Sequence, residues 1–411
     1  MTKDKKQQTL VPRLRFPEFR DYQAWTVDRL GNLFIERQET GNEELPLLSL
    51  TDKEGLIPQK DSGRKDNSNV NKSKYLRVAV GDIAYNTMRM WEGRSALATN
   101  EGLVSPAYTV CVPTDRVDSH FFSYYFKTGH LIREFRRYSQ GLVKDTLSLK
   151  YEVFSRIHVF FPGLREQQKI AECLGSLDDL IAAEGRKLAA LRDHKKGLMQ
   201  QLFPCEGETR PRLRFPEFRD AGEWKERTIG EFGDIKMCKR ILASQTNDCE
   251  GVPFYKIGTL GGKPDAYIPR ELYEEYRERF SFPKKGEVLI TCSGTVGKCV
   301  PYDGEDAYYQ DSNIVWIANS QRDVSNQFLH SVLLNVDWGR LNSTTITRIY
   351  IDDLRMLQIK VPPKKVEQQR IADCLSALDG LIAAQAEKLD ALRIHKRGLM
   401  QQLFPAPEDH Q

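Results

Sequence analysis

Several features that mark common classes of protein are scarce in this 411-residue chain. Its eight cysteines form no CxxC pair and its seven histidines do not cluster near them, which argues against a zinc site. No apolar run approaches about 18 residues, so no membrane-spanning helix is expected. The opening MTKDKKQQTL lacks the apolar core of a secretion signal, and free thiols fit a reducing cytosol. We therefore expect a cytoplasmic protein that binds neither a metal nor a membrane.

Enzyme signatures are missing as well. Residues 293–299, SGTVGKC, resemble a phosphate-binding loop, but that motif needs Gly in place of Cys292 and Ser or Thr in place of Cys299. We interpret the segment as a tight turn between two strands. No GxSxG, HExxH, dinucleotide-binding or amino-methyltransferase motif occurs. The chain is therefore expected to have no catalytic residue.

The charge of the chain is modest and uneven. The net charge is +4, so no polybasic tail points to nucleic acid. Residues 130–144, HLIREFRRYSQGLVK, are nevertheless basic and include a single Glu. A run of this kind is more often a solvated face than a binding site. Charge alone therefore leaves the partner open.

The most informative feature that is present is a repeat. Residues 166–204 and 367–405 align without a gap and are identical at about 28 of 39 positions. A second repeat, PRLRFPEFRD, begins at Pro12 and again at Pro211. Two dissimilar stretches of about 150 residues lie between these matching ends. A matching scaffold around divergent inserts favours one body that holds two different readers.

Each long repeat predicts one helix with a seven-residue apolar period, which forms a narrow seam and requires a partner helix. Pro162 and Pro363 precede these helices, and Pro204 and Pro405 end them. The predicted seam residues are Ile170, Leu174, Leu177, Ile181, Leu188, Leu191, Leu198, Leu202, Ile371, Leu375, Leu378, Ile382, Leu389, Leu392, Leu399 and Leu403.

Polar residues interrupt the seam at equivalent places, Glu184 with Gln385 and Lys195 with Lys396. Such groups cost stability but restrict the register and the orientation of the partner. The helices could pair between two chains or within one. We favour an antiparallel coiled coil within the chain, because both copies are present in it and each follows its own globular domain. The molecule would then be pseudo-twofold.

Both inserts are predicted to be mixed α/β (α+β) domains on a similar skeleton of strand, strand and helix. The predicted elements are residues 76–88, 102–113 and 120–139 in the first insert, and residues 286–302, 310–320 and 326–341 in the second.

The loops of the two inserts are rich in side chains that read base edges and phosphates. Each such residue taken alone is more often an ordinary surface residue, and the hypothesis depends on their gathering in matching loops. The candidate DNA-binding residues are Asn86, Thr87, Arg89, Trp91, Arg94, Gln140, Lys144, Lys256, Thr259, Ser293, Thr295, Lys298, Gln310, Asn313, Thr345 and Arg348.

The chain resembles the DNA specificity subunit of type I restriction–modification systems. The motifs that carry the resemblance are EQQxIAxCL, LDxLI and HKxGLMQQLFP, each present twice. Gly81-Asp82-Ile83 and Gly286-Glu287-Val288 also resemble the turn that leads into a strand in that family's target recognition domains. The pattern covers residues 12–405. It implies recognition domains at residues 1–162 and 205–362, coiled-coil helices at 163–204 and 363–405, and a tail at 406–411.

The resemblance implies a bacterial or archaeal, non-catalytic subunit that binds double-stranded DNA with a bipartite site. Each recognition domain would read one half-site and the helices would set the gap. Two methyltransferase subunits would dock on the helices, and restriction subunits would join them. No cofactor is expected on this chain, whereas S-adenosylmethionine and ATP with Mg are expected on the partners, which methylate adenine and cleave DNA.

Exposed helix charges could serve methyltransferase docking or be ordinary solvated coil charges, Lys187, Arg192 and Lys196 with Lys388, Arg393 and Arg397. The alternative function is a coiled-coil scaffold that binds proteins without reading DNA. A steep fall of DNA affinity with salt would separate the two functions.

Overall fold

The computed structural model describes residues 10–42, 44–51, 55–63, 65–66, 68–341 and 348–406. The chain divides into two compact units. Unit 1 comprises Met1–Gly185 and Glu387–Gln411, and unit 2 comprises Arg186–Ala386. The domain boundaries expected above follow the repeats rather than these units, and they stay a prediction.

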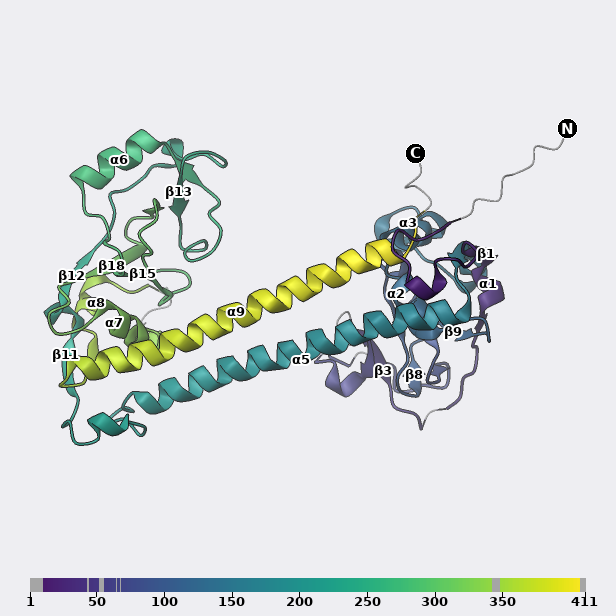
Figure 1. The fold of residues 1–411 in the computed structure, drawn as a ribbon, viewed down its shortest axis with the longest axis horizontal. Coiled ribbons are helices and arrows are strands. Elements are labelled where there is room, and N and C mark those ends of the chain that lie inside the picture. The colour runs from purple at the N-terminus through teal and green to yellow at the C-terminus, as the bar shows by residue number, and fades with distance from the viewer. Residues whose placement is uncertain are drawn as a thin grey trace. The chain divides into compact units, whose positions relative to one another are not determined.

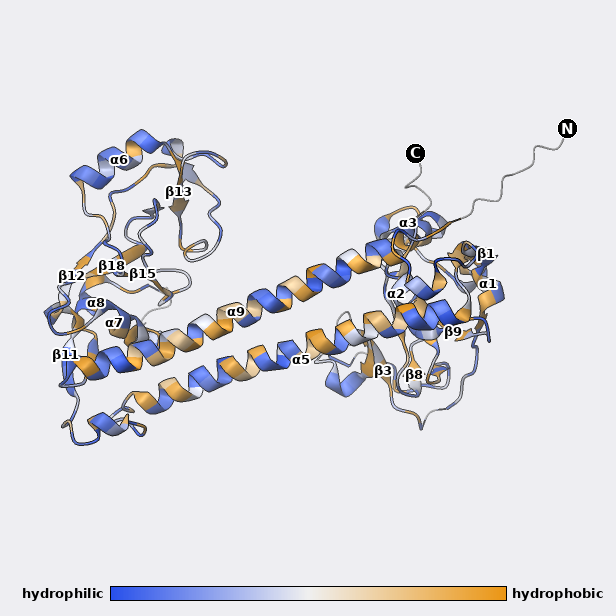
Figure 2. Ribbon diagram, in the orientation of Figure 1, coloured by the Kyte–Doolittle hydropathy of each residue, from blue (hydrophilic) through white to orange (hydrophobic). Residues whose placement is uncertain are grey.

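Two long helices, α5 (Leu164–Leu202) and α9 (Lys365–Leu403), coincide with the long repeats (Figure 1). Each helix alternates apolar and polar residues along its length, as its heptad period requires (Figure 2). None of the predicted seam side chains is exposed. The two predicted helices are confirmed.

The polar pairs in unit 1 show that α5 and α9 run antiparallel there. Asp178 and Glu184 of α5 pair with Lys396 and Lys388 of α9, so the residue number of the partner falls as α5 advances. The Lys396 ammonium lies 2.6 Å from Asp178 Oδ2. The predicted pairing of the helices within one chain is therefore confirmed.

Unit 2 contains the equivalent of one of these pairs. Lys195 Nζ on α5 lies 2.6 Å from Asp379 Oδ1 on α9. Lys195 and Lys396 occupy equivalent positions of the repeat, as do Asp379 and Asp178. The lysines that interrupt the apolar seam therefore pair with carboxylates of the facing helix in both units.

The Glu-Gln-Gln motif at the start of each long helix binds the PRLRFPEFRD segment of the same repeat and an earlier short helix. Arg15 donates to both carboxylate oxygens of Glu166, at 2.9 and 2.7 Å, and Arg214 does the same to Glu367 at 2.7 and 2.8 Å. Gln167 and Gln368 accept the N–H of the residue that caps an earlier short helix, Asp118 before residues 119–125 at 2.9 Å and Ser325 before residues 326–333 at 3.2 Å. Both PRLRFPEFRD segments are thereby fixed to the helices.

The main sheet of unit 1 is antiparallel, in the order β2-β9-β6-β7. Its strands are β2 (Phe34–Glu36), β9 (Tyr108–Pro113), β6 (Ile83–Asn86) and β7 (Ser95–Leu97). The smaller strand pairs and the helices are β1 (Thr26–Arg29) with β10 (His158–Phe161), β3 (Leu48–Thr51) with β4 (Gly55–Pro58), β5 (Leu76–Val78) with β8 (Gly102–Val104), α1 (Leu30–Leu33), α2 (Ser119–Tyr125), α3 (Gly129–Tyr138) and α4 (Tyr151–Phe154).

The core of unit 1 is aromatic and includes both long helices. Phe34, Phe121 and Phe122 are fully buried beside Leu174 of α5. Phe404, just beyond α9, stacks on Tyr125 with 5.2 Å between ring centroids. The core of unit 1 therefore includes the start of α5 and the residue that follows α9.

Unit 2 has an equivalent antiparallel sheet in the order β12-β18-β15-β16. Its strands are β12 (Gly233–Lys236), β18 (Ile314–Asn319), β15 (Val288–Thr291) and β16 (Cys299–Pro301). The other elements are β11 (Lys225–Thr228) with β19 (Gln358–Val361), β13 (Val252–Tyr255) with β14 (Tyr267–Ile268) and β17 (Tyr308–Tyr309), α6 (Arg270–Arg279), α7 (Asn326–Leu333) and α8 (Ile351–Met356).

Most of the predicted strands and helices are shorter in the structure than in the sequence analysis. The strand expected over residues 76–88 is divided between β5 and β6 by a turn at Gly81, whose φ is +93°. That expected over 102–113 is divided between β8 and β9, and that over 310–320 begins only at Ile314. Irregular turns within apolar runs leave no trace in hydrophobic periodicity.

Two predicted helices are also interrupted. Residues 120–139 form α2 and α3, because the chain turns before Gly129. The helix expected over 326–341 ends at Leu333, and a 3₁₀ turn follows over Trp338–Leu341. The Trp338 indole N–H donates to Leu333 O at 3.2 Å and satisfies the end of α7. Residues 286–302 form the β15–β16 hairpin, as the interpretation of SGTVGKC as a turn requires.

Candidate nucleic-acid interface

Three loops of unit 1 meet at Thr87, which follows β6. Its N–H donates to Ala107 O at 3.1 Å, and its carbonyl accepts the N–H of Leu149 at 2.9 Å. The Thr87 hydroxyl also donates to Ala107 O, at 2.9 Å. These bonds hold together the β6–β7 loop, the loop before β9 and the loop before α4.

Unit 2 has the same backbone frame at Cys292, which follows β15. The Cys292 N–H donates to Asn313 O at 2.8 Å, and its carbonyl accepts the N–H of Ile349 at 2.8 Å. Because a buried cysteine takes the place of Thr87, the frame depends on main-chain groups. Side chains on the loops can therefore differ between the units while the loops stay in equivalent places.

Trp91 is the centre of a basic cluster in unit 1. The ammonium of Lys144 lies 5.2 Å from its ring centroid, and the guanidinium of Arg136 lies 6.0 Å from it. The Trp91 indole N–H donates to Met88 O at 2.9 Å, which fixes the ring. The structure thus brings together Trp91 and Lys144, two predicted site residues from different loops.

Four other predicted residues of unit 1 lie at the end of β6 or on the loop that joins it to β7. Asn86 Oδ1 accepts the N–H two residues further on, at 2.9 Å, and the Thr87 hydroxyl is engaged as described. Arg89 and Arg94 lie 3.3 and 3.6 Å from Glu92, and the Arg89 side chain is 59% exposed. Asn86 and Thr87 therefore build the loop, whereas Arg89 is available at its surface.

The segment after α3 is a hairpin with an apolar tip. Gln140 and Ser148 exchange two backbone hydrogen bonds of 2.9 Å at its base, and the Gln140 side chain is exposed. Gly141 has φ +151°, and an added Cβ would lie 2.5 Å from Thr146 O, so glycine is required there. Leu142, at the tip, is fully exposed. The backbone hydrogen bonds at its base fix the conformation of the hairpin, while Leu142 at its tip is exposed to solvent.

In unit 2, three predicted site residues lie together on the frame at Cys292. The Ser293 hydroxyl donates to Asn313 Oδ1 at 2.7 Å. The backbone of Ser293 also bridges to Arg348, whose guanidinium lies 5.7 Å from the ring centroid of Tyr350. Polar groups from three loops therefore converge in unit 2, as they do in unit 1.

The β15–β16 turn presents Thr295 and Lys298, both exposed. Gly297, with φ +81°, packs so closely on Trp338 that an added Cβ would lie 2.2 Å from the indole. An added Cβ on Gly261 would lie 3.7 Å from Lys298 Cε, so the loop after β13 approaches this turn. The turn therefore packs closely against Trp338, and the Lys298 side chain is exposed to solvent.

The remaining predicted residues of unit 2 are less free to contact a ligand. The Lys256 ammonium lies 3.0 Å from Asp265, and the Thr259 hydroxyl accepts the Lys256 N–H at 3.0 Å. Gln310 is half-buried and donates its backbone N–H to a neighbouring strand. Thr345 lies outside the described residues.

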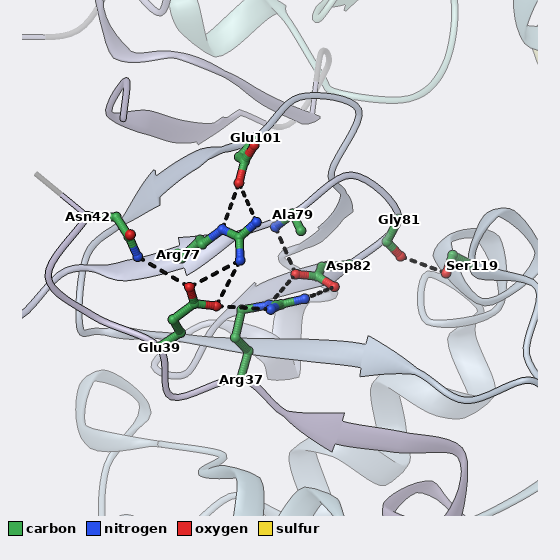
Figure 3. Close-up of polar contacts among 9 residues, drawn as sticks. All are labelled: Arg37, Glu39, Asn42, Arg77, Ala79, Gly81, Asp82, Glu101 and Ser119. Carbon is green, nitrogen blue, oxygen red and sulfur yellow. Dashed lines mark hydrogen bonds and ion pairs between the residues drawn. The ribbon is translucent and has the colours of Figure 1, made fainter. Parts of the chain in front are cut away.

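The turn at Gly81-Asp82 that leads into β6 is a structural centre beside these loops (Figure 3). Arg37 donates to both oxygens of the buried Asp82, at 2.8 and 3.2 Å. Arg77 lies between Glu39 and Glu101, at 2.9 and 2.6 Å. These charged side chains are engaged with one another, so the cluster positions β6 rather than a ligand.

The equivalent position in unit 2 is Glu287. One of its oxygens accepts the Lys284 N–H at 2.8 Å, as Asp82 accepts the N–H of Ala79 at 2.9 Å. Within the described residues no arginine chelates Glu287, and burial raises its pKa above the ordinary value, although the Lys284 N–H and the charges of Lys284 and Lys236 act against this. The two turns share a backbone hydrogen bond to the carboxylate. They differ because Arg37 pairs with the charge of Asp82, whereas no arginine of the described residues pairs with Glu287.

Two kinds of site are not found in the part of the chain that the structure describes. Within it, no group of three or more His, Cys, Asp or Glu side chains is placed to hold a metal ion. None of its helices is both long enough and apolar enough to cross a membrane.

The sequence matches one family over most of its length. Residues 23–193 and 221–393 each match the type I restriction modification DNA specificity domain. The chain belongs to this family. The two matched segments each contain one recognition-loop cluster and most of one long helix, which agrees with the repeat seen in the structure.

Two members of this family are similar to the chain in sequence, one over part of its length and one over most of it. A putative type I restriction enzyme specificity subunit of Haemophilus influenzae is 47% identical over 161 residues, which is 39% of this chain and 42% of that relative. The MjaVIII specificity subunit of Methanocaldococcus jannaschii is 23% identical over 356 residues, which is 81% of this chain and 82% of that relative.

Solved structures of the same kind share the fold. The S subunit of a type I restriction–modification system from M. genitalium aligns over 96% of this chain and 99% of its own, with TM-score 0.61 and 14% identity. A second structure, from a study of complex assembly in a type I system, covers 92% of this chain and 97% of its own, with TM-score 0.55 and 18% identity. The predicted specificity-subunit fold is confirmed.

The sequence analysis did not select Arg136 or Leu142, which the structure places among the candidate loops of unit 1. Arg136 belongs to the basic run of residues 130–144, which is a visible signal but does not say which cation approaches Trp91. Leu142 is apolar, so its residue type does not suggest a surface position, and only the structure of the hairpin shows that it is exposed. Neither position could be chosen from residue type alone.

Proposed function

We propose that this specificity-family chain reads a bipartite site in double-stranded DNA, with one loop cluster for each half-site. The observation that carries the proposal is the shared main-chain frame at Thr87 and Cys292. It places three loops in equivalent positions in both units while their side chains differ. Two readers of unlike sequences need such an arrangement.

The side chains on the loops suit different parts of DNA. In unit 1, Lys144 and Arg136 place cations beside Trp91, and Arg89 adds an exposed guanidinium on the β6–β7 loop, which fits phosphate and guanine contacts. In unit 2, Asn313 and Lys298 add an amide and an ammonium, and amides pair with adenine. The chain itself would bind and position DNA without catalysing a reaction.

The helices α5 and α9 would set the gap between half-sites and dock two methyltransferase subunits. Restriction subunits would join that assembly in the cytoplasm of a bacterium or archaeon. S-adenosylmethionine and ATP with Mg would bind to these partners, which would methylate adenine and cleave DNA. This division of labour leaves the present chain with sequence choice alone.

A domain exchange tests the reading by halves. Residues 22–161 would be replaced by the corresponding segment of another family member, and methylated sites would be mapped with the same methyltransferase partner. One half-site should change and the other half-site and the gap should stay. If both halves changed together, the two units would not read independently.

A further inference from the structure

The hairpin that follows α3 carries two exposed apolar side chains at its tip. Leu142 is fully exposed, and Val143 is 61% exposed. A single apolar residue on a protein surface is common and needs no explanation. Val70, in the same unit, is exposed to the same degree as Leu142. The conformation of the hairpin and its neighbours are what distinguish Leu142 from Val70.

The backbone around Leu142 is fixed from both sides. The Thr146 N–H donates to Val143 O at 3.0 Å, and the Thr146 hydroxyl accepts the Val143 N–H at 3.2 Å. Gly141, on the other side of Leu142, lies so close to Thr146 O that only glycine fits. Burial of Leu142 in a ligand would therefore cost less conformational entropy than burial of a side chain on a mobile loop.

The hairpin belongs to the loops that meet at Thr87. Its base runs directly into Leu149, whose N–H donates to Thr87 O at 2.9 Å. Lys144, two residues beyond Leu142, places its ammonium 5.2 Å from the ring centroid of Trp91. A fully exposed leucine therefore lies next to a cation, within the loop cluster that is proposed to bind DNA.

We propose that Leu142 enters the base stack of the DNA that unit 1 binds and separates two neighbouring base pairs. The inference rests on the proposed function, because it requires the loop cluster of unit 1 to bind duplex DNA. Leucine is one of the apolar residues that proteins insert between base steps, and such a wedge kinks the duplex by about 20–90°. Lys144 and Arg136 would supply cations to the phosphates beside the opened step.

A wedge at Leu142 would give unit 1 a sequence preference without a hydrogen bond to a base. Pyrimidine–purine steps unstack and kink at a lower cost than other steps. We therefore expect the half-site that unit 1 reads to contain a TA or CA/TG step where Leu142 enters. Replacing that step by a stiffer one should weaken binding by the wild type more than binding by a variant without the wedge.

Three substitutions test the wedge in the complete complex with its methyltransferase. Leu142→Ala removes the wedge, whereas Leu142→Met keeps an apolar side chain of similar size. Val70→Ala is the matched control, because Val70 is equally exposed and lies on none of the three loops that meet at Thr87. Because both positions are exposed, none of the substitutions should change thermal unfolding, which is measured for each variant.

The first readout is the shape of a duplex that contains the methylated site mapped for this chain. Energy transfer between dyes at its two ends measures the bend, and 2-aminopurine at successive positions fluoresces where stacking is lost. The methylated position is left out, because the methyltransferase would flip that base. The wild type, Leu142→Met and Val70→Ala should bend the duplex and unstack one step of the unit 1 half-site. Leu142→Ala should lose both signals.

The second readout is duplex affinity as a function of salt. Leu142→Ala should weaken binding to the mapped site roughly tenfold, as expected when one buried apolar contact at an interface is truncated. The slope of log K against log salt should stay that of the wild type, because leucine neutralises no phosphate. Lys144→Ala should instead reduce the slope by about 0.9 and leave the unstacked step in place.

Three other outcomes would overturn the wedge. A loss of affinity in Leu142→Ala with the bend unchanged would mean that Leu142 contacts a thymine methyl group in the groove. Failure of Leu142→Ala to assemble with the methyltransferase would mean that the tip binds protein. A wild-type complex that prefers the mapped site without bending it would overturn the wedge alone. Equal affinity of the wild type for mapped and unrelated duplexes would overturn the proposed function and the wedge together.

Discussion

Arg214 and Glu367 form a buried ion pair whose partners depend on each other. The Glu367 side chain is 1% exposed and also accepts the Trp224 indole N–H at 3.3 Å. Removing one member of such a pair leaves the other charge buried without compensation. Removing one partner is therefore expected to cost more free energy of unfolding than the intact pair contributes relative to an apolar contact of similar size.

Arg214→Ala is expected to destabilise unit 2 by about 3–5 kcal/mol. Arg212→Ala is the matched control, because Arg212 is 69% exposed and reaches only Glu208, at 3.9 Å, among the described residues. Its effect should stay within about 0.5 kcal/mol. Urea unfolding followed by circular dichroism gives both values. Equal effects for the two variants would contradict the assigned role of the buried pair.

Glu287 gives a pH prediction of defined sign. Its pKa is raised in the folded protein, so the ionised carboxylate destabilises unit 2 at neutral pH, and this cost disappears as pH falls through the raised pKa. Glu287→Gln keeps an acceptor for the Lys284 N–H and removes the charge. The variant should melt above wild type at pH 8, and the gap should narrow toward pH 5. Calorimetry at both pH values checks this, and a gap independent of pH would refute it.

At the residue level, the sequence predicts the chemistry of the loops better than their contacts. Trp91 and Lys144 are both predicted site residues, but only the structure places them 5.2 Å apart, because the loops that hold them are distant in the chain. Asn86 is also a predicted site residue, and its side chain holds the loop. Residue type shows what a side chain can bind, while the fold decides whether it is available.

At the scale of the helices, the seam shows how polar residues specify one pairing. Lys396 pairs with Asp178, and Lys195 pairs with Asp379 at the equivalent place. The heptad period predicts the lysines as interruptions of the seam, since they stand at apolar positions. Their partners could not be predicted in the same way, because the aspartates follow a seam leucine and have no periodic signal.

A charge exchange tests this pairing. Asp178→Lys places two ammonium groups together and removes the acceptor of the Tyr124 hydroxyl at 2.7 Å, so it should destabilise unit 1. Adding Lys396→Asp should recover part of the stability, with a coupling energy of about 0.5–1 kcal/mol, since Asp178 is half exposed. Denaturant unfolding of the four proteins of the cycle measures it. Additive effects would show that the pair does not specify the register.

At the scale of the whole molecule, two units with one skeleton present unlike surfaces. Their sheets and loop frames correspond, while the side chains on their loops differ. The repeats in the sequence allow this division to be predicted, because identical scaffold segments enclose each insert. The contacts within each loop cluster could not be predicted, since the loops that meet at Thr87 and at Cys292 come from separate segments of the chain.

Lengthening the scaffold tests the proposed role of the helices in setting the gap. Four residues, about 6 Å as helix, would be inserted between residues 202 and 211. The preferred gap between half-sites should change or disappear, while the two half-site sequences stay the same. Mapping the methylated sites of the variant shows the gap directly. Altered half-site sequences would mean that the helices and the loops do not have separate roles.

The central claim is that this chain chooses a split DNA sequence for its partners, and a methylome tests it most directly. The chain would be co-expressed with its methyltransferase subunit in an unmethylated host, and modified adenines would be mapped by single-molecule sequencing. We predict one motif of two defined halves with a fixed gap, absent when this chain is omitted. An assembled complex that leaves the genome unmethylated, or that methylates an undivided motif, would contradict the claim.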